Sequence, residues 1–231
     1  MITQFFHKMS VDKRWPMLLL MLVSTLFCVG LIAYRMKHTG HGFYRFLNWN
    51  LFLAWIPFIV STLLWIYREK VSNLLLIVGI GFWLLFFPNA PYILTDLIHL
   101  SPKESVPFWF DLVLILSFAW TGLMVGLLSL QDIHNLVLQR SKPWFGWTCA
   151  LGFIGLGAFG VYLGRYLRFN SWEFFTDPRP LFHEVADRFV HPLHYGTTYK
   201  VTLLFFIFLS LAYLGLRFAG RTRNNPVGTI V

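Results

Sequence analysis

Four polar side chains follow a proline at spacings that bring them together on a helix. Tyr92, Thr95, Asp96 and His99 come after Pro91, and at 3.6 residues per turn they share one face. A carboxylate and an imidazole placed in this way can move a proton or orient a bound group. Ionisable groups are costly in strongly apolar surroundings, so we interpret this face as a candidate functional site.

A second polar set lies further along the chain. Arg165 and Arg168 are three residues apart, so they share a helical face if the helix continues. Guanidinium groups bind phosphate or carboxylate in a bidentate manner, and Asn170 follows them. Two interpretations stay open: the pair binds Asp96 or an anionic ligand, or it anchors a helix end among lipid headgroups.

The elements that position these residues are predicted to be membrane-spanning helices. Of the 231 residues, 57% are hydrophobic and 13% are charged, whereas soluble domains have about 25% charged residues. Apolar runs of about 20 residues match a hydrocarbon core about 30 Å thick. The sequence therefore predicts an all-α, polytopic transmembrane helical bundle of about six spans, in a single domain over residues 1–231. The expected spans are 15–34, 46–67, 73–100, 108–130, 144–164 and 200–217.

The third span is predicted to break between Pro88 and Pro91. Residues 73–87 precede the first proline and rise only about 22 Å as an α-helix, short of the membrane core. We expect Pro88 to push Phe87 out of the α region, and Asn89 to act as the N-cap of a second, half-length helix. The N–H groups of such a half-helix could hold an anion, as in discontinuous transporter helices. The alternative is a turn followed by a polar interfacial helix.

The order of the spans determines which residues can meet. Spans three and five end, and spans four and six begin, on one membrane face, so the polar residues there are expected to approach one another. Asp111 is then either a partner of the arginine pair or a carboxylate favoured at a helix N-terminus. The candidate ligand-binding residues are Asn89, Tyr92, Thr95, Asp96, His99, Arg165, Arg168 and Asn170, with Asp111, Trp172 and Glu173 as further candidates.

The polar segment 165–199 is predicted to contain a short helix over 181–190. Its spacing of phenylalanine and valine residues gives one apolar face, which favours a position along the membrane interface. Asp132 and His134, at the end of span four, are expected to face water. A GxxxG pair, Gly160 and Gly164, predicts close helix packing in span five.

Several other functions find no support in the residues. Neither of the two cysteines has a cysteine or histidine neighbour, so we expect no disulfide, metal or cofactor. The row His183, Asp187, His191 and His194 matches no metal-ligand spacing, and a solvated segment is favoured over a metal site. The 19 Lys and Arg residues are scattered along the chain, which argues against nucleic acid and for anionic lipid headgroups. No motif of soluble catalysis is present.

Two stretches carry a resemblance to a known family. PNAPYILTDLIHL and GRYLRFNSWEF resemble the two signatures of the bacterial membrane proteins grouped as domain of unknown function 1361. The second signature of that family usually has Phe, Trp and Asp where this chain has Tyr166, Phe169 and Glu173. The resemblance extends from about span two onward. It implies an integral bacterial membrane protein and implies no reaction.

The combined prediction is a multi-pass protein of the bacterial cytoplasmic membrane. Lys and Arg residues near the spans favour both termini in the cytoplasm. We expect it to bind or transport a small or lipid-linked anionic molecule, with the lipid bilayer as its other partner. A membrane enzyme acting on a lipid headgroup, with His99 as general base and Asp96 as its orienter, and a non-catalytic assembly partner stay open as alternatives. A non-enzyme is favoured, and the residues specify no oligomeric state.

Overall fold

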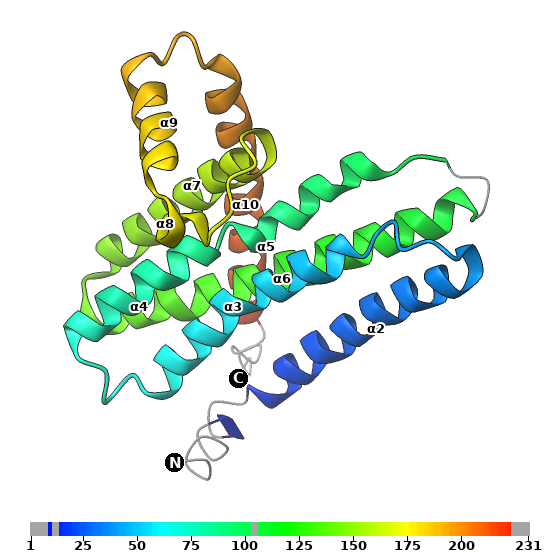
Figure 1. The fold of residues 1–231 in the computed structure, drawn as a ribbon. Helices are drawn as coiled ribbons and strands as arrows, with labels where there is room; N and C mark the ends of the chain where they lie inside the picture. The colour runs from blue at the N-terminus through cyan, green and yellow to red at the C-terminus, as the bar shows by residue number, and fades with distance from the viewer. Residues whose placement is uncertain (1–8, 11–13, 103–105, 223–231) are drawn as a thin grey trace, which may run out of the picture. The chain divides into compact units, whose positions relative to one another are not determined.

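The computed structural model describes residues 9–10, 14–102 and 106–222, and these residues form helices joined by short turns (Figure 1). The chain divides into two compact units, residues 1–136 and 137–231. The expectation of a single domain therefore stays a prediction.

The first unit begins with long helices that have identifiable start and stop signals. A proline at the start of α2 and Gly40 at its end, with a left-handed φ of 69°, define that helix. The Ser72 side chain accepts a hydrogen bond from the Leu75 N–H at 3.2 Å and caps α4. The elements are α2 (Trp15–Thr39), α3 (Phe46–Ile66), α4 (Asn73–Phe86), α5 (Asn89–Tyr92), the 3-10 helix η1 (Ile93–His99) and most of α6 (Phe108–Arg140).

The second unit pairs two long helices and carries the polar segment between them. The elements are α7 (Pro143–Tyr166), α8 (Glu173–Thr176), α9 (Arg179–Val190) and α10 (Gly196–Thr222). Helix α7 packs against α10. A helix in the polar segment was predicted, and α9 covers that range. Its apolar side chains Phe182 and Phe189 are exposed, and its position at the membrane interface stays a prediction.

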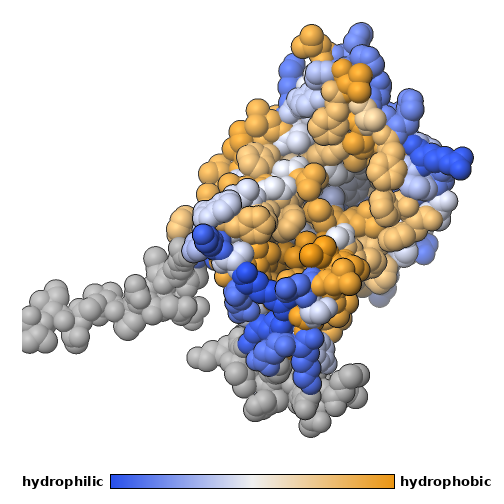
Figure 2. All heavy atoms as spheres, turned by 90° about the vertical axis from the view of Figure 1, so that its left-hand side faces the viewer, coloured by the Kyte–Doolittle hydropathy of each residue, from blue (hydrophilic) through white to orange (hydrophobic). Residues whose placement is uncertain are grey.

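Six helical stretches of the described residues are long and apolar enough to cross a membrane, which confirms the predicted number. They are α2, α3, Asn73–His99, α6, α7 and Gly196–Ala219. Hydrophobic side chains cover large parts of the face shown in Figure 2. Helix α6 continues to Arg140, well beyond the predicted end of span four.

Helix α6 lies at the centre of the packing. Of the 18 consecutive residues that are most apolar in α6, 61% are buried, whereas the corresponding share in α2 is 17%. Its buried side chains, including Leu114 and Phe118, pack in one cluster with Cys28 of α2, Leu51 of α3 and Ile93 of η1. Helix α3 also packs against α4, α5 and η1.

Two glycines of α6 allow α5 and η1 to approach closely. A Cβ atom on Gly126 would lie 2.6 Å from the Cβ of Ala90, and one on Gly122 would lie 2.7 Å from Ile93 Cδ1 and 3.0 Å from the Ala90 carbonyl oxygen. Gly122 and Gly126 form a GxxxG pair, the spacing that brings membrane helices into close contact. Close packing had been predicted only for the GxxxG pair of span five.

The helix is interrupted in the third span, but not for the predicted reason. Helix α4 ends at Phe86, α5 begins at Asn89, and the segment after Tyr92 is a 3-10 helix. Phe87 keeps α-helical angles, with φ −53° and ψ −39°. The prediction that Pro88 displaces Phe87 from the α region was wrong, because the chain passes both residues without leaving helical geometry.

Gly126→Ala should lower the stability of the protein by about 1–3 kcal/mol, since overpacking forces backbone shifts. The matched control is Gly81→Ala, where an added Cβ meets nothing within 4 Å and the substitution should be neutral or stabilising by up to about 1 kcal/mol. Unfolding midpoints in detergent measure both effects. Equal midpoints for the two variants would contradict the close approach of α5 to α6.

Candidate functional site

Asp96 lies on the buried side of η1. In a 3-10 helix, side chains three residues apart lie in line, which places Asp96 in line with Ile93 and His99. Ile93 and Asp96 are 0% and 1% exposed, whereas His99 is exposed. The Asn50 amide of α3 donates a hydrogen bond to Asp96 Oδ2 at 2.8 Å. The carboxylate is therefore buried against a donor from a neighbouring helix.

The predicted polar face of four residues was wrong in its geometry, because the segment is not an α-helix. At three residues per turn, Thr95 lies in line with Tyr92, about a third of a turn away from Asp96 and His99. The Thr95 hydroxyl donates to the Tyr92 carbonyl at 2.6 Å. The four residues therefore divide into two lines, and the carboxyl group of Asp96 and the imidazole of His99 lie in the same line.

Asn89 bonds backward along the chain. Its Nδ2 donates to the Phe86 carbonyl at 2.9 Å, which satisfies one of the last carbonyl groups of α4. Pro88, and not Asn89, stands immediately before α5, and no side chain caps that helix. The prediction of Asn89 as an N-cap was therefore wrong, and its amide closes the preceding helix.

A buried ion pair joins the end of α2 to the start of α6. Arg35 Nε donates to Asp111 Oδ1 at 2.7 Å, and Arg35 Nη2 donates to Asp111 Oδ2 at 3.0 Å. Both residues are 2% exposed. This bidentate geometry fixes the orientation of both groups, and the pairing compensates much of the cost of burying the charges. Asp111 lies in the first turn of α6, which is one of the two roles left open for it. Its bidentate partner is Arg35, which neither alternative named.

Tyr44 links this ion pair to η1. The Arg35 guanidinium lies over the Tyr44 ring, 4.7 Å from its centroid. Burial raises the pKa of Tyr44 to about 12, and the negative charge of Asp111 acts in the same direction. The hydroxyl therefore stays protonated at neutral pH, and it donates a long, 3.3 Å hydrogen bond to the His99 carbonyl.

Arg35, Tyr44 and Asn50 were not among the predicted site residues. The order of the spans contained the signal, because span one ends and span two begins on the same membrane face where span three ends and span four begins. The predicted approach of polar residues involved only spans three to six. A single arginine buried near the end of an apolar helix then needs an acidic partner on that face.

The arginine pair of the second unit does not share a helical face. Helix α7 ends at Tyr166, and Arg168 has a left-handed φ of 62°. The Phe169 N–H turns back to the Leu163 carbonyl at 3.3 Å. The prediction that Arg165 and Arg168 lie on one face required a continuing helix, and the helix does not continue.

Asn170 and Glu173 bond to each other at the start of α8. The Asn170 backbone N–H donates to Glu173 Oε2 at 3.1 Å, and the Asn170 amide donates to Glu173 Oε1 at 3.0 Å. Trp172, between them, is partly exposed. These residues and the arginines belong to the second unit, whereas Asp96 and Asp111 belong to the first. The predicted approach of the two sets therefore stays a prediction.

In the second unit, the Asp187 carboxylate of α9 has two polar partners. Tyr195 donates to Asp187 Oδ2, and His191 Nδ1 lies 2.8 Å from Asp187 Oδ1. The bonds from Tyr195 and His191 hold the pKa of Asp187 below its ordinary value, and the bond to Asp187 raises the pKa of Tyr195. With His194 they line a surface pocket of about 330 Å³. Among the described residues, no three metal-binding side chains are grouped to hold a metal ion.

The opposite end of the first unit carries a second ion pair. Arg14, just before α2, pairs with Asp132 of α6, and Ser61 of α3 donates to Asp132 Oδ2 at 3.2 Å. His134 is fully buried. The prediction that Asp132 and His134 face water was wrong, because α6 continues to Arg140 and keeps both residues within the helix packing.

Six apolar spans define a polytopic α-helical membrane protein. The chain belongs to the family described as "Protein of unknown function (DUF1361)", whose model matches residues 49–212. This match confirms the resemblance seen in the sequence. Asn50, Asp96 and Asp111 lie inside the matched region, whereas Arg14 and Arg35 precede it.

No curated protein and no solved structure matches the chain. The chemistry of the site therefore has to be argued from its own residues.

Tyr195→Phe should raise the pKa of Asp187, because it removes the hydrogen bond that lowers this pKa most. A lowered carboxyl pKa stabilises the folded state above the unfolded pKa, and this stability is lost as the pH falls through the folded pKa. As the pH falls, Asp187 in the variant should therefore cause a smaller decrease in the free energy of unfolding than Asp187 in the wild type does. Carboxyl ¹³C NMR titration measures the pKa.

His183→Gln is the matched control, because the His183 charge is the smallest of the contributions that lower the pKa of Asp187. The control should move the Asp187 pKa less than Tyr195→Phe does. An equal or larger shift in the control would show that Tyr195 is not the main partner of this carboxylate.

Proposed function

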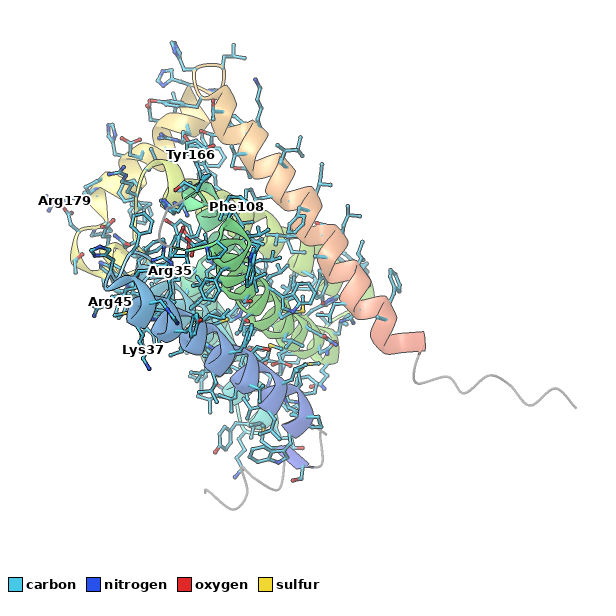
Figure 3. The ribbon with its side chains drawn as sticks, turned by 90° about the vertical axis from the view of Figure 1, so that its right-hand side faces the viewer. Arg35, Lys37, Arg45, Phe108, Tyr166 and Arg179 are labelled. Carbon is cyan, nitrogen blue, oxygen red and sulfur yellow. The ribbon has the colours of Figure 1, made fainter. Side chains whose placement is uncertain are left out.

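We propose that this protein binds a small or lipid-linked anionic molecule at the end of the first unit where α2 ends and α6 begins. The distribution of charge supports the proposal. The buried charges of Arg35 and Asp111 cancel, while Lys37 and Arg45 stay exposed near them (Figure 3). Among the described residues, neither Lys37 nor Arg45 takes part in an ion pair.

The exposed cations are the groups available to an anion. The Arg35 guanidinium is held on Asp111 by two hydrogen bonds, so it is not free to change partners. Each Lys or Arg near a membrane surface contributes about 1 kcal/mol to the attraction of anionic lipids. Lys37 and Arg45 together therefore contribute roughly 2 kcal/mol, or about 30-fold in affinity.

Asp96 and His99 supply the groups that orient the ligand or move a proton. They lie one 3-10 turn apart on η1, Asp96 buried and His99 exposed. Asn50 fixes the carboxylate, as preorganised sites require.

The proposed location is the bacterial cytoplasmic membrane, with both termini in the cytoplasm. The distribution of Lys and Arg residues supports this orientation. The proposed binding end then faces away from the cytoplasm.

Replacing both exposed cations, Lys37→Gln with Arg45→Gln, should weaken binding of an anionic phospholipid by about tenfold or more, because two favourable charges are removed. The probes are phosphatidylglycerol and inorganic phosphate, which separate a lipid-linked from a small ligand. Native mass spectrometry of the full chain measures lipid retention, and calorimetry measures phosphate binding. Lys70→Gln is the matched control, since Lys70 is exposed at the opposite end of α3.

Asp96→Asn is the second variant, because it keeps the shape of the buried side chain and replaces its carboxyl group by an amide. It should weaken binding of whichever probe the wild type retains, while membrane insertion stays intact. Wild-type retention of both probes by the double variant and by Asp96→Asn would overturn the proposal. Covalent conversion of a retained lipid would instead support the membrane-enzyme alternative.

A further inference from the structure

A pocket lies at the opposite end of the first unit from the proposed anion site. It has a volume of about 200 Å³ and lies between the start of α2, the second half of α3 and the last part of α6. One part of its wall is apolar, with Leu18, Phe58 and Leu128. Met17, which also lines it, is 40% exposed, so the pocket reaches the surface of an apolar helix.

The other part of the wall is polar and is organised around Arg14. Thr62, Gln131 and Asp132 line this part with it. Arg14 Nη2 donates to Asp132 and, at 3.4 Å, to the Thr62 hydroxyl. Arg14 Nη1 is buried and has no hydrogen-bond partner in the part of the chain that the structure describes. A buried donor without a hydrogen-bond partner is unfavourable, so an acceptor oxygen at this place would be stabilising.

The charge and size of the pocket restrict what it can hold. The charges of Arg14 and Asp132 cancel. An anionic group would therefore place a net negative charge beside the Asp132 carboxylate, whereas a group without net charge would not. The volume is below the roughly 300–1,000 Å³ of pockets that enclose a whole small molecule. Part of a larger amphiphile fits, with its remaining apolar surface in the bilayer.

We propose that this pocket binds a zwitterionic phospholipid. Its phosphate or ester oxygens accept from Arg14, and its first acyl carbons contact Leu18, Phe58 and Leu128. Thr62 and Gln131 offer further hydrogen bonds to the headgroup or glycerol region. The site does not depend on the proposed anion site, because the two lie at opposite ends of α2 and α6 and select different headgroup charges.

Leu128→Phe tests the proposal without changing a polar group. The added ring carbons occupy the pocket, so zwitterionic lipid retention should fall at least about tenfold, which corresponds to 1.4 kcal/mol. Leu26→Phe is the matched control, because Leu26 is 70% exposed on α2 and does not line the pocket. The full chain is released from micelles with equal amounts of phosphatidylethanolamine, phosphatidylcholine and phosphatidylglycerol with identical acyl chains, and native mass spectrometry counts the lipids retained.

The Lys37→Gln, Arg45→Gln background weakens anionic lipid binding at the proposed anion site, so most of the lipid that this variant retains reports on the pocket. In this background the proposal predicts retention of ethanolamine or choline lipid over phosphatidylglycerol. A preference for phosphatidylethanolamine over phosphatidylcholine would show that the pocket also binds the N–H groups of the ethanolamine headgroup. Equal retention of the two lipids would show that it binds only the phosphate and ester oxygens.

Arg14→Lys provides a second test, because an ammonium keeps the charge beside Asp132 and lacks the second planar N–H group. Zwitterionic lipid retention should fall while the unfolding midpoint stays near that of the wild type. Unchanged retention in Leu128→Phe, or preferred retention of phosphatidylglycerol in the Lys37→Gln, Arg45→Gln background, would overturn the proposal.

Discussion

Two arginine–aspartate pairs hold α2 along α6, one pair at each end of the first unit. Arg14 pairs with Asp132 and Arg35 with Asp111, so the two helices run antiparallel. The step from Arg14 to Arg35 is 21 residues, and so is the step from Asp111 to Asp132. As α-helix, 21 residues rise about 31 Å, close to the roughly 30 Å of a hydrocarbon core. Charges are costly inside that core unless paired, so this spacing lets each pair lie near a boundary.

The neighbouring elements are attached to these pairs. At one end, Tyr44 packs on Arg35 and donates to the last residue of η1; at the other, Ser61 of α3 donates to Asp132. The two ends nevertheless differ in what they present. One end surrounds a neutralised pair with exposed cations, which favours anions, while the other encloses a small neutral pocket with an apolar wall. The two proposed sites therefore differ in the headgroup charge that each of them would select.

Helix number and type could be predicted because apolar length is a local property of the sequence. The partners of the charged groups could not, because they depend on which helix ends pack together. For Asp111 two alternatives stayed open, pairing with arginines of the second unit or a place at a helix N-terminus, and neither alternative included Arg35. Asp132 was placed in water because the predicted span ended before it. The prediction of one polar face after Pro91 was wrong for a different reason. The segment has three residues per turn and not 3.6, which separates Thr95 from Asp96. No residue type in this segment indicates that change of helix type.

The most direct test of whether the Arg35–Asp111 pair holds α2 on α6 is the free energy of unfolding in one detergent. It is compared between the wild type, Arg35→Asp, Asp111→Arg and the double variant in which the two residues are exchanged. Each single change leaves two like charges buried together and should cost about 3–5 kcal/mol or more. The exchange restores an oppositely charged pair, so it should recover most of that loss if the pair holds α2 on α6. An exchanged variant as unstable as the sum of the two single variants would contradict the account.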